Sequence, residues 1–100
     1  MAGRRSRKLR DELQKALLKE RYDDALHFYE ALELTEPREA RWPHRKGDLL
    51  NRLGRKDAAI RSYESAVDLY ADAGFIARAA AMAKVVLGID AARTDVLDRV

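Results

Sequence analysis

The residues with the clearest potential for chemistry are the histidines that stand near acidic residues. His27 lies three residues after Asp24 and three residues before Glu30. On a helix this spacing would bring an imidazole next to carboxylates, an arrangement that can bind a metal ion or transfer a proton. No second histidine lies at helical spacing from His27, so the pattern favours a solvated surface residue. His44 follows Pro43 in a basic first turn, where it is expected to tune partner binding rather than catalysis.

Other signatures of catalysis or cofactor binding are missing from the sequence. The chain has no cysteine, which excludes disulfides, thiolate metal sites and cysteine nucleophiles together. It has no glycine-rich phosphate loop, no nucleophile elbow and no zinc-ligand spacing. We therefore expect no enzyme activity, no cofactor and no metal. Because disulfides mark exported proteins, the lack of cysteine favours a cytoplasmic location.

Basic residues are concentrated at the N-terminal end, where Arg4, Arg5, Arg7, Lys8 and Arg10 face no acidic residue. Residues 1–6 are expected to form a flexible basic arm. Clustered arginines can neutralise nucleic-acid phosphates, so a nucleic-acid-binding accessory protein is one alternative function. The net charge of only +3 and the lack of exposed aromatics among the basic residues weigh against that alternative.

The composition is typical of a soluble, helix-rich protein. Hydrophobic residues make up 47% of the chain and charged residues 37%, with only two prolines and five glycines. Acidic residues at positions 11, 12 and 20 interrupt what would be the apolar core of a signal peptide. No apolar run approaches the roughly 20 residues that span a bilayer, so no membrane insertion is expected.

Apolar residues recur at helical spacing along most of the chain, and no stretch alternates as a strand would. Pro37 ends one helical run, Pro43 fits best at the first position of the next, and Gly54 suits a left-handed C-cap. The predicted helices cover residues 7–20, 22–35, 43–53, 57–73, 75–89 and 94–100. The sequence thus predicts an all-α domain over residues 7–100, with short connections between antiparallel neighbours.

The second and fourth predicted helices carry the same residue pattern. Identical residues recur after 34 positions in the pairs Arg21 and Arg55, Asp23 and Asp57, Ala25 and Ala59, Tyr29 and Tyr63, and Glu30 and Glu64. A small residue with an aromatic four positions later lets two helix backbones approach while the ring fills the groove beside them. Gly74 and Ala79 repeat the spacing of Gly54 and Ala59 after only 20 residues, so a third repeat is expected to be shortened.

This pattern resembles the tetratricopeptide repeat (TPR) family, in a bacterial type of module. The resemblance covers roughly residues 6–73 and rests on Ala25, Tyr29, Leu32 and Pro37 in the first repeat and on Gly47 to Leu50, Leu53-Gly54, Ala59, Tyr63 and Ala66 in the second. It implies a right-handed solenoid of about 2.5 repeats with five to six helices. Trp42, Pro43 and Leu13 depart from the family pattern.

In this family the first helix of each repeat lines a concave groove that binds peptides. Carried over by position, the implied groove comprises Arg7, Arg10, Gln14, Arg41, His44, Arg45, Asp48, Arg52 and Arg78. Guanidinium groups bind carboxylates with two parallel hydrogen bonds, so the resemblance implies a partner protein with an acidic or C-terminal peptide. The leading functional prediction is a protein-interaction scaffold.

The fifth predicted helix is apolar around most of its circumference, interrupted only by Arg78 and Lys84. Such a helix must be covered on more than one side. A possible oligomer or partner face comprises Phe75, Ala79, Met82, Val86 and Ile89. A structural module that forms homodimers through this helix is the second alternative function.

Three aromatic residues need a structural assignment. Tyr29 and Tyr63 occupy the repeat positions of groove-filling residues and are expected in the core. Trp42 falls in the irregular connection before Pro43, where it is expected to be partly exposed, either as packing or as an interface anchor.

Overall fold

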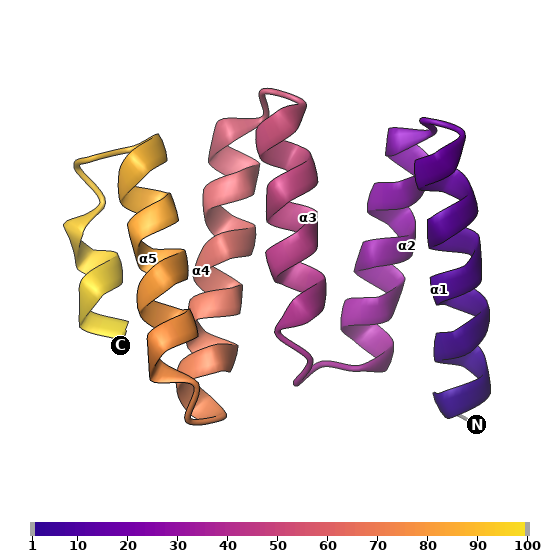
Figure 1. Cartoon of the computed structure of the whole chain (residues 1–100), viewed down its shortest axis with the longest axis horizontal. Helices are drawn as coiled ribbons and strands as arrows, with labels where there is room; N and C mark the ends of the chain where they lie inside the picture. Colours follow the sequence, from indigo (N-terminus) through magenta and orange to yellow (C-terminus); the bar gives the residue numbers. More distant parts are fainter. Residues whose placement is uncertain (1, 100) are drawn as a thin grey trace.

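The chain folds into a single row of helices in which each element packs against its neighbour in sequence (Figure 1). The structure is a computed structural model that describes residues 2–99. Its elements are α1 (Ala2–Leu18), α2 (Tyr22–Thr35), α3 (Arg41–Arg52), α4 (Lys56–Asp72), α5 (Ile76–Ile89) and the 3-10 helix η1 (Thr94–Arg99). No strand occurs among these residues. The predicted all-α class and the packing of sequential helices in pairs are therefore confirmed.

Three of the helix connections share one backbone geometry. Glu20, Gly54 and Gly74 have positive φ values of 56°, 77° and 87°. In each connection the next residue donates its backbone N–H to a carbonyl five residues earlier: Arg21 to Ala16, Arg55 to Leu50 and Phe75 to Tyr70. This pair of features is the glycine-type helix ending, which satisfies the last carbonyls of a helix and reverses the chain sharply. Helices joined in this way lie antiparallel, as Figure 1 shows.

Small buried residues recur at one position after each sharp connection. Ala25, Ala59 and Ala79 are each fully buried, at equivalent positions just after the three sharp connections. Tyr29 and Tyr63, four residues after the first two alanines, are also buried, so both tyrosines belong to the core as predicted. The repeat spacing thus fixes which side of α2 and α4 faces the neighbouring helices.

Residue 1 of the flexible arm expected over residues 1–6 lies outside the described residues, and residues 2–6 form the first turns of α1 instead of an arm. Arginine and lysine are good helix formers, and Ser6 is only 2% exposed within the fold. The predicted start of the first helix at residue 7 is therefore too late.

α3 also begins earlier than predicted, at Arg41 rather than at Pro43. Proline is tolerated there because the first N–H groups of a helix have no partner within it. Trp42 is consequently helical and 1% exposed, which makes the expectation of partial exposure wrong. Its Nε1 donates a hydrogen bond to Oε1 of Glu36 at 3.0 Å, and its ring centroid lies 6.4 Å from that of Tyr29.

The C-terminal segment packs onto α4 and α5 as the short helix η1. Val96 of this helix is fully buried. The buried carboxylate of Glu64 accepts a hydrogen bond from Arg93 at 2.6 Å and lies 3.8 Å from Arg99. Arg99 also pairs with Asp68 at 3.1 Å. These ion pairs join the end of the chain to the middle of α4.

Candidate functional site

A cleft of about 760 Å³ opens between α3, the end of α4 and the start of α5. This volume lies in the range of sites that bind small molecules or short peptide segments. The lining residues come from four segments: Arg38, Glu39 and Ala40 before α3; Arg41, His44, Arg45 and Asp48 on α3; Leu69, Tyr70 and Ala73 at the end of α4; and Phe75, Arg78, Ala81 and Met82 at the start of α5. We call this surface the α3–α5 cleft.

The α3 wall of the cleft follows from helical spacing. Arg41, Arg45 and Asp48 recur every three to four residues, so they share one side of α3. The adjoining side of the helix carries Gly47, whose missing side chain lets α3 approach Tyr63 of α4. The small residue therefore sets the distance between the wall and the helix that forms the back of the cleft.

A chain of hydrogen bonds ties this wall to α4. The Tyr63 hydroxyl donates to Oδ1 of Asp48 at 2.6 Å. Nδ1 of His44 and the Tyr70 hydroxyl share a hydrogen bond at 2.9 Å, with the two rings edge to face. Nε2 of His44 lies 3.7 Å from Oδ2 of Asp48. The polar atoms of His44 and Asp48 are thus engaged with each other and with two tyrosines of α4.

The two core tyrosines keep their hydroxyl protons well into the alkaline range. Burial raises the pKa of Tyr63 well above its ordinary value of 10.0, and the hydrogen bond to Asp48 raises it further. Burial also raises the pKa of Tyr29, against the opposing effect of the nearby Arg45 charge. Tyr63 is therefore a fixed hydrogen-bond donor to Asp48 at neutral pH.

The arginines of the cleft differ in how far their charges are compensated. Arg41 lies over the Trp42 ring at 4.4 Å, and its Nε is 3.6 Å from Glu39. Arg38, Arg45 and Arg78 form no ion pair among residues 2–99.

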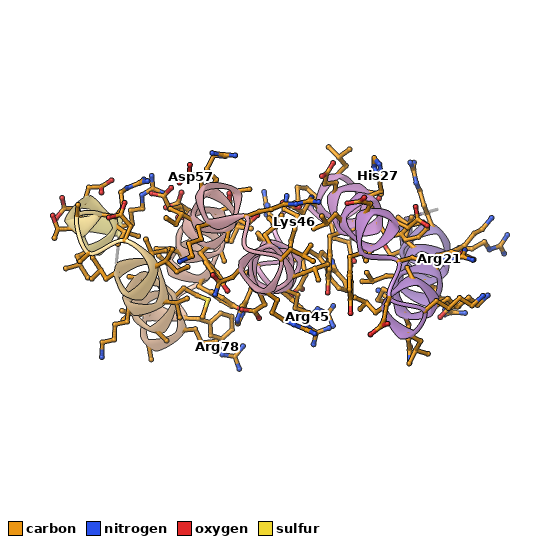
Figure 2. All side chains as sticks on the ribbon, turned by 90° about the horizontal axis from the view of Figure 1, so that it is seen from above. Arg21, His27, Arg45, Lys46, Asp57 and Arg78 are labelled. Atoms are coloured by element: carbon orange, nitrogen blue, oxygen red, sulfur yellow. The ribbon has the colours of Figure 1, made fainter. Side chains whose placement is uncertain are left out.

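Two of these uncompensated arginines stand on opposite walls of the cleft. Figure 2 shows Arg45 on α3 and Arg78 on α5 projecting to the same side of the molecule, away from the side of His27 and Asp57. Arg78 lies 5.3 Å from the centre of the Phe75 ring. The cleft therefore presents a positive charge on each wall.

The structure brings together five of the nine residues of the implied groove: Arg41, His44, Arg45, Asp48 and Arg78. Arg7, Gln14 and Arg52 are exposed but do not line the cleft. Arg10 lies 3.7 Å from Glu36, the carboxylate that also accepts the Trp42 hydrogen bond. The residues of the implied groove that lie together are therefore those between α3 and α5.

The predicted face of the fifth helix does not form one exposed surface. Ala79 and Val86 are fully buried and Met82 is 9% exposed, because α4 and η1 pack against α5. Ile89 is half-buried, and Phe75 is 53% exposed and lines the cleft. Because three of the five residues are buried within the chain, the five do not form the single exposed oligomer or partner face that the sequence predicts.

Sequence reasoning missed the apolar part of the cleft. Leu69 and Ala73 line it because α5 arrives immediately after Gly74 and turns back beside the end of α4. The 20-residue spacing between Gly54 and Gly74 was the sequence signal for this arrangement, because it predicts that the fifth helix begins early. Glu64 was also missed as a buried partner of the C-terminal arginines.

A second basic surface lies on α1, away from the cleft. Arg4, Lys8 and Lys15 are exposed, and their spacing places them on the same side of α1; the exposed Lys19 follows directly after the helix ends at Leu18. The buried residues Leu13 and Ala16 lie elsewhere on the helix, against the core. Only Lys15 of the four forms an ion pair among residues 2–99, at 3.9 Å from Glu12.

None of the helices in the described part of the chain has the length and apolar character needed to cross a membrane. No protein-family model matches this sequence, and no curated protein is significantly similar to it.

Proposed function

We propose that this chain is a protein-interaction module whose α3–α5 cleft binds an acidic segment of a partner protein. The observation that carries the proposal is the charge of the cleft. Four arginines and two carboxylates line it, which leaves an excess of two positive charges. A concave surface with uncompensated guanidinium groups attracts carboxylates and can hold them with paired hydrogen bonds.

The two carboxylates of the cleft both have neighbours within the fold. Glu39 lies beside Arg41. Asp48 accepts the hydrogen bond of the neutral Tyr63 hydroxyl and lies near His44, so it keeps its negative charge and offsets one of the arginines. The arginines that remain for a ligand are Arg38, Arg45 and Arg78, all exposed.

A TPR-like architecture supports the same function. The proposed architecture is a right-handed solenoid of about 2.5 repeats, in which the sharp connections at Glu20 and Gly54 are equivalent and η1 replaces the second helix of the last repeat. Such rows of helices use their concave side for binding. The α3–α5 cleft would then lie between the first helices of two successive repeats.

A binding role accounts for the polar groups of the cleft better than catalysis does. His44 and Asp48 could suggest acid–base chemistry, but Tyr63 is 1% exposed and its hydroxyl is occupied by Asp48. Asp48 thus serves to join α3 to α4.

Nucleic-acid binding through α1 is the second candidate. It is favoured by the exposed row of Arg4, Lys8 and Lys15 along one side of that helix, which Lys19 continues just after the helix ends. The row lies beside a hollow of about 140 Å³, much smaller than the α3–α5 cleft, which Lys15 and Lys19 line together with the carboxylates of Glu12 and Asp24. Homodimer formation through α5 has less support, because the central residues of the expected face are buried.

The proposal is tested by titrating the chain with a glutamate-rich peptide at increasing salt. Affinity should fall steeply with ionic strength, because the charge pairs at the rim of the cleft are screened. The Arg45→Glu variant should weaken binding at low salt by about tenfold or more, since a charge-assisted hydrogen bond is replaced by repulsion. The matched control, Arg61→Glu, reverses an exposed charge of α4 that does not line this cleft and should bind like the native chain. An affinity that does not respond to salt or to Arg45→Glu would refute the proposal.

A further inference from the structure

We infer that the segment bound in the α3–α5 cleft carries one large apolar side chain with an acidic residue on each side of it. This inference rests on the proposed function and defines its ligand more narrowly. It follows from how charge and apolar surface are distributed within the cleft.

The back of the cleft is formed by uncharged side chains. Leu69, Tyr70 and Ala73 come from the end of α4, and Ala81 and Met82 from the facing side of α5. The one hydroxyl among them, that of Tyr70, is already hydrogen-bonded to His44. No charged side chain of α4 lines this part of the cleft. An acidic segment without an apolar side chain would leave this surface in contact with water, whereas an apolar side chain of a ligand would cover it and gain free energy roughly in proportion to the area buried.

Phe75 provides the clearest sign of an unfilled apolar contact. It is one of the few large hydrophobic residues of the described chain that are strongly exposed, at 53%, and it lines the cleft. The other strongly exposed ones among residues 3–99 are Leu18, Leu34, Ile76 and Leu97, none of which lines the cleft. Exposed aromatic rings, phenylalanine among them, are enriched where proteins contact one another, so Phe75 is a suitable contact for a partner side chain.

The two walls of the cleft determine where the acidic residues of the ligand bind. Arg78 lies over the Phe75 ring, so the α5 wall offers a guanidinium directly beside an apolar contact. On the opposite wall Arg45 is exposed and has no ion pair among residues 2–99. Figure 2 shows both arginines projecting to the same side, from different helices. A ligand whose apolar side chain enters between the walls therefore meets a positive charge on either side.

The fit favours a segment of another protein over a whole helix of a second copy. The cleft holds about 760 Å³, which suits a short segment with one anchoring side chain. The central residues of α5 that could support a larger contact, Ala79 and Val86, are buried within the chain. The inferred ligand is therefore a short acidic–apolar–acidic segment of a partner protein.

The test uses fluorescence anisotropy with four labelled peptides of equal length. The parent peptide has a central leucine flanked by glutamates; the other three replace the leucine by serine, the glutamates by glutamines, or both. Replacing leucine by serine should weaken binding about tenfold, the effect expected for burying one such side chain. Replacing the glutamates should weaken binding at low salt by a similar factor and remove its salt dependence.

Protein variants assign these effects to the cleft. Phe75→Ser should weaken the leucine peptide but leave the serine peptide unchanged, whereas Arg78→Ala should weaken both. Leu34→Ser is the matched control, because it removes an apolar side chain that is 85% exposed and lies outside the cleft. Circular dichroism and the serine peptide together verify that Phe75→Ser is folded.

The outcomes separate this inference from the proposed function. The leucine and serine peptides could bind equally, with both depending on Arg45 and Arg78. In that case the proposed acidic ligand is supported, and the inferred apolar anchor is wrong. If no glutamate peptide binds, both are overturned. If the chain self-associates through the cleft and the peptide does not compete, the occupant is a second copy and the inference is wrong.

Discussion

Gly47 of α3 lies directly against the ring of Tyr63 of α4. A Cβ atom on Gly47 would stand 2.8 Å from both Cδ1 and Cε1 of that ring, closer than packed atoms ever lie. The ring cannot move aside cheaply, because it is 1% exposed and its hydroxyl is held by Asp48. This contact fixes the spacing of α3 and α4, and with it the α3 wall of the cleft.

Gly47→Ala should therefore destabilise the fold. Overpacking of a core contact costs about 1–3 kcal/mol, and the better helix propensity of alanine recovers up to about 1 kcal/mol of this. The melting temperature should fall by roughly 4–8 °C for each net kcal/mol in a domain of this size. Gly88→Ala is the control, since a Cβ at Gly88 meets nothing within 4 Å and should leave stability equal or higher. Equal melting temperatures for the two variants would show that the contact between Gly47 and Tyr63 leaves room for a methyl group.

Glu20→Gly should stabilise the fold by about 1 kcal/mol. Glu20 has a φ of 56°, in the left-handed region that is strained for residues with a side chain, and Gly54 and Gly74 occupy the equivalent positions. Urea unfolding measures the difference. Lys19→Gly, which changes the exposed neighbour, should destabilise or have no effect, so an equal stabilisation by both glycines would contradict the explanation.

Much of the fold could be predicted from local signals. Helical periodicity and the positions of Pro37, Gly54 and Gly74 define the elements, and the 34-residue pairing places Tyr29 and Tyr63 in the core. These signals succeed because the same short connections and the same small residues recur along the chain.

The cleft was predictable only in part, because its shape depends on tertiary arrangement. Arg45 and Arg78 could be assigned to a groove by repeat position, but the apolar contribution of Leu69 depends on how α5 folds back on α4. The pairing of Arg10 with Glu36 and the burial of Trp42 depend on the course of residues 36–40, which has no counterpart elsewhere in the sequence.

Alkaline pH should destabilise the fold through the two core tyrosines. Burial raises the pKa of both Tyr63 and Tyr29 in the folded state, so the folded chain binds their protons more tightly than the unfolded chain does. The resulting stability is complete below the unfolded value of 10.0 and is lost as the pH rises above it. Urea unfolding across this range should show the decline, and Tyr63→Phe should make it shallower. A stability profile that is the same in native and Tyr63→Phe chains would be inconsistent with a shifted Tyr63.

The buried carboxylate of Glu64 should control the attachment of η1. Glu64 raises the pKa of Arg93 above its ordinary value, accepts its hydrogen bond and lies near Arg99. In Glu64→Gln the charge is lost while the shape is kept, so amide hydrogen exchange over residues 94–99 should become faster with less change in α1 to α3. Asp68→Asn, which removes only the exposed pairing with Arg99, should have a smaller effect. Equal exchange in the two variants would argue against a special role of Glu64.

The most direct test of the central claim is a map of where an acidic ligand binds. Titration of the isotope-labelled chain with a glutamate-flanked leucine peptide, followed by backbone amide NMR signals, reports the contact surface residue by residue. If the α3–α5 cleft is the binding site, the shifts concentrate in residues 38–48 and 69–82, and Arg45→Glu makes them smaller at the same peptide concentration. Shifts confined to the basic row on α1, or no shifts at all at low salt, would contradict it.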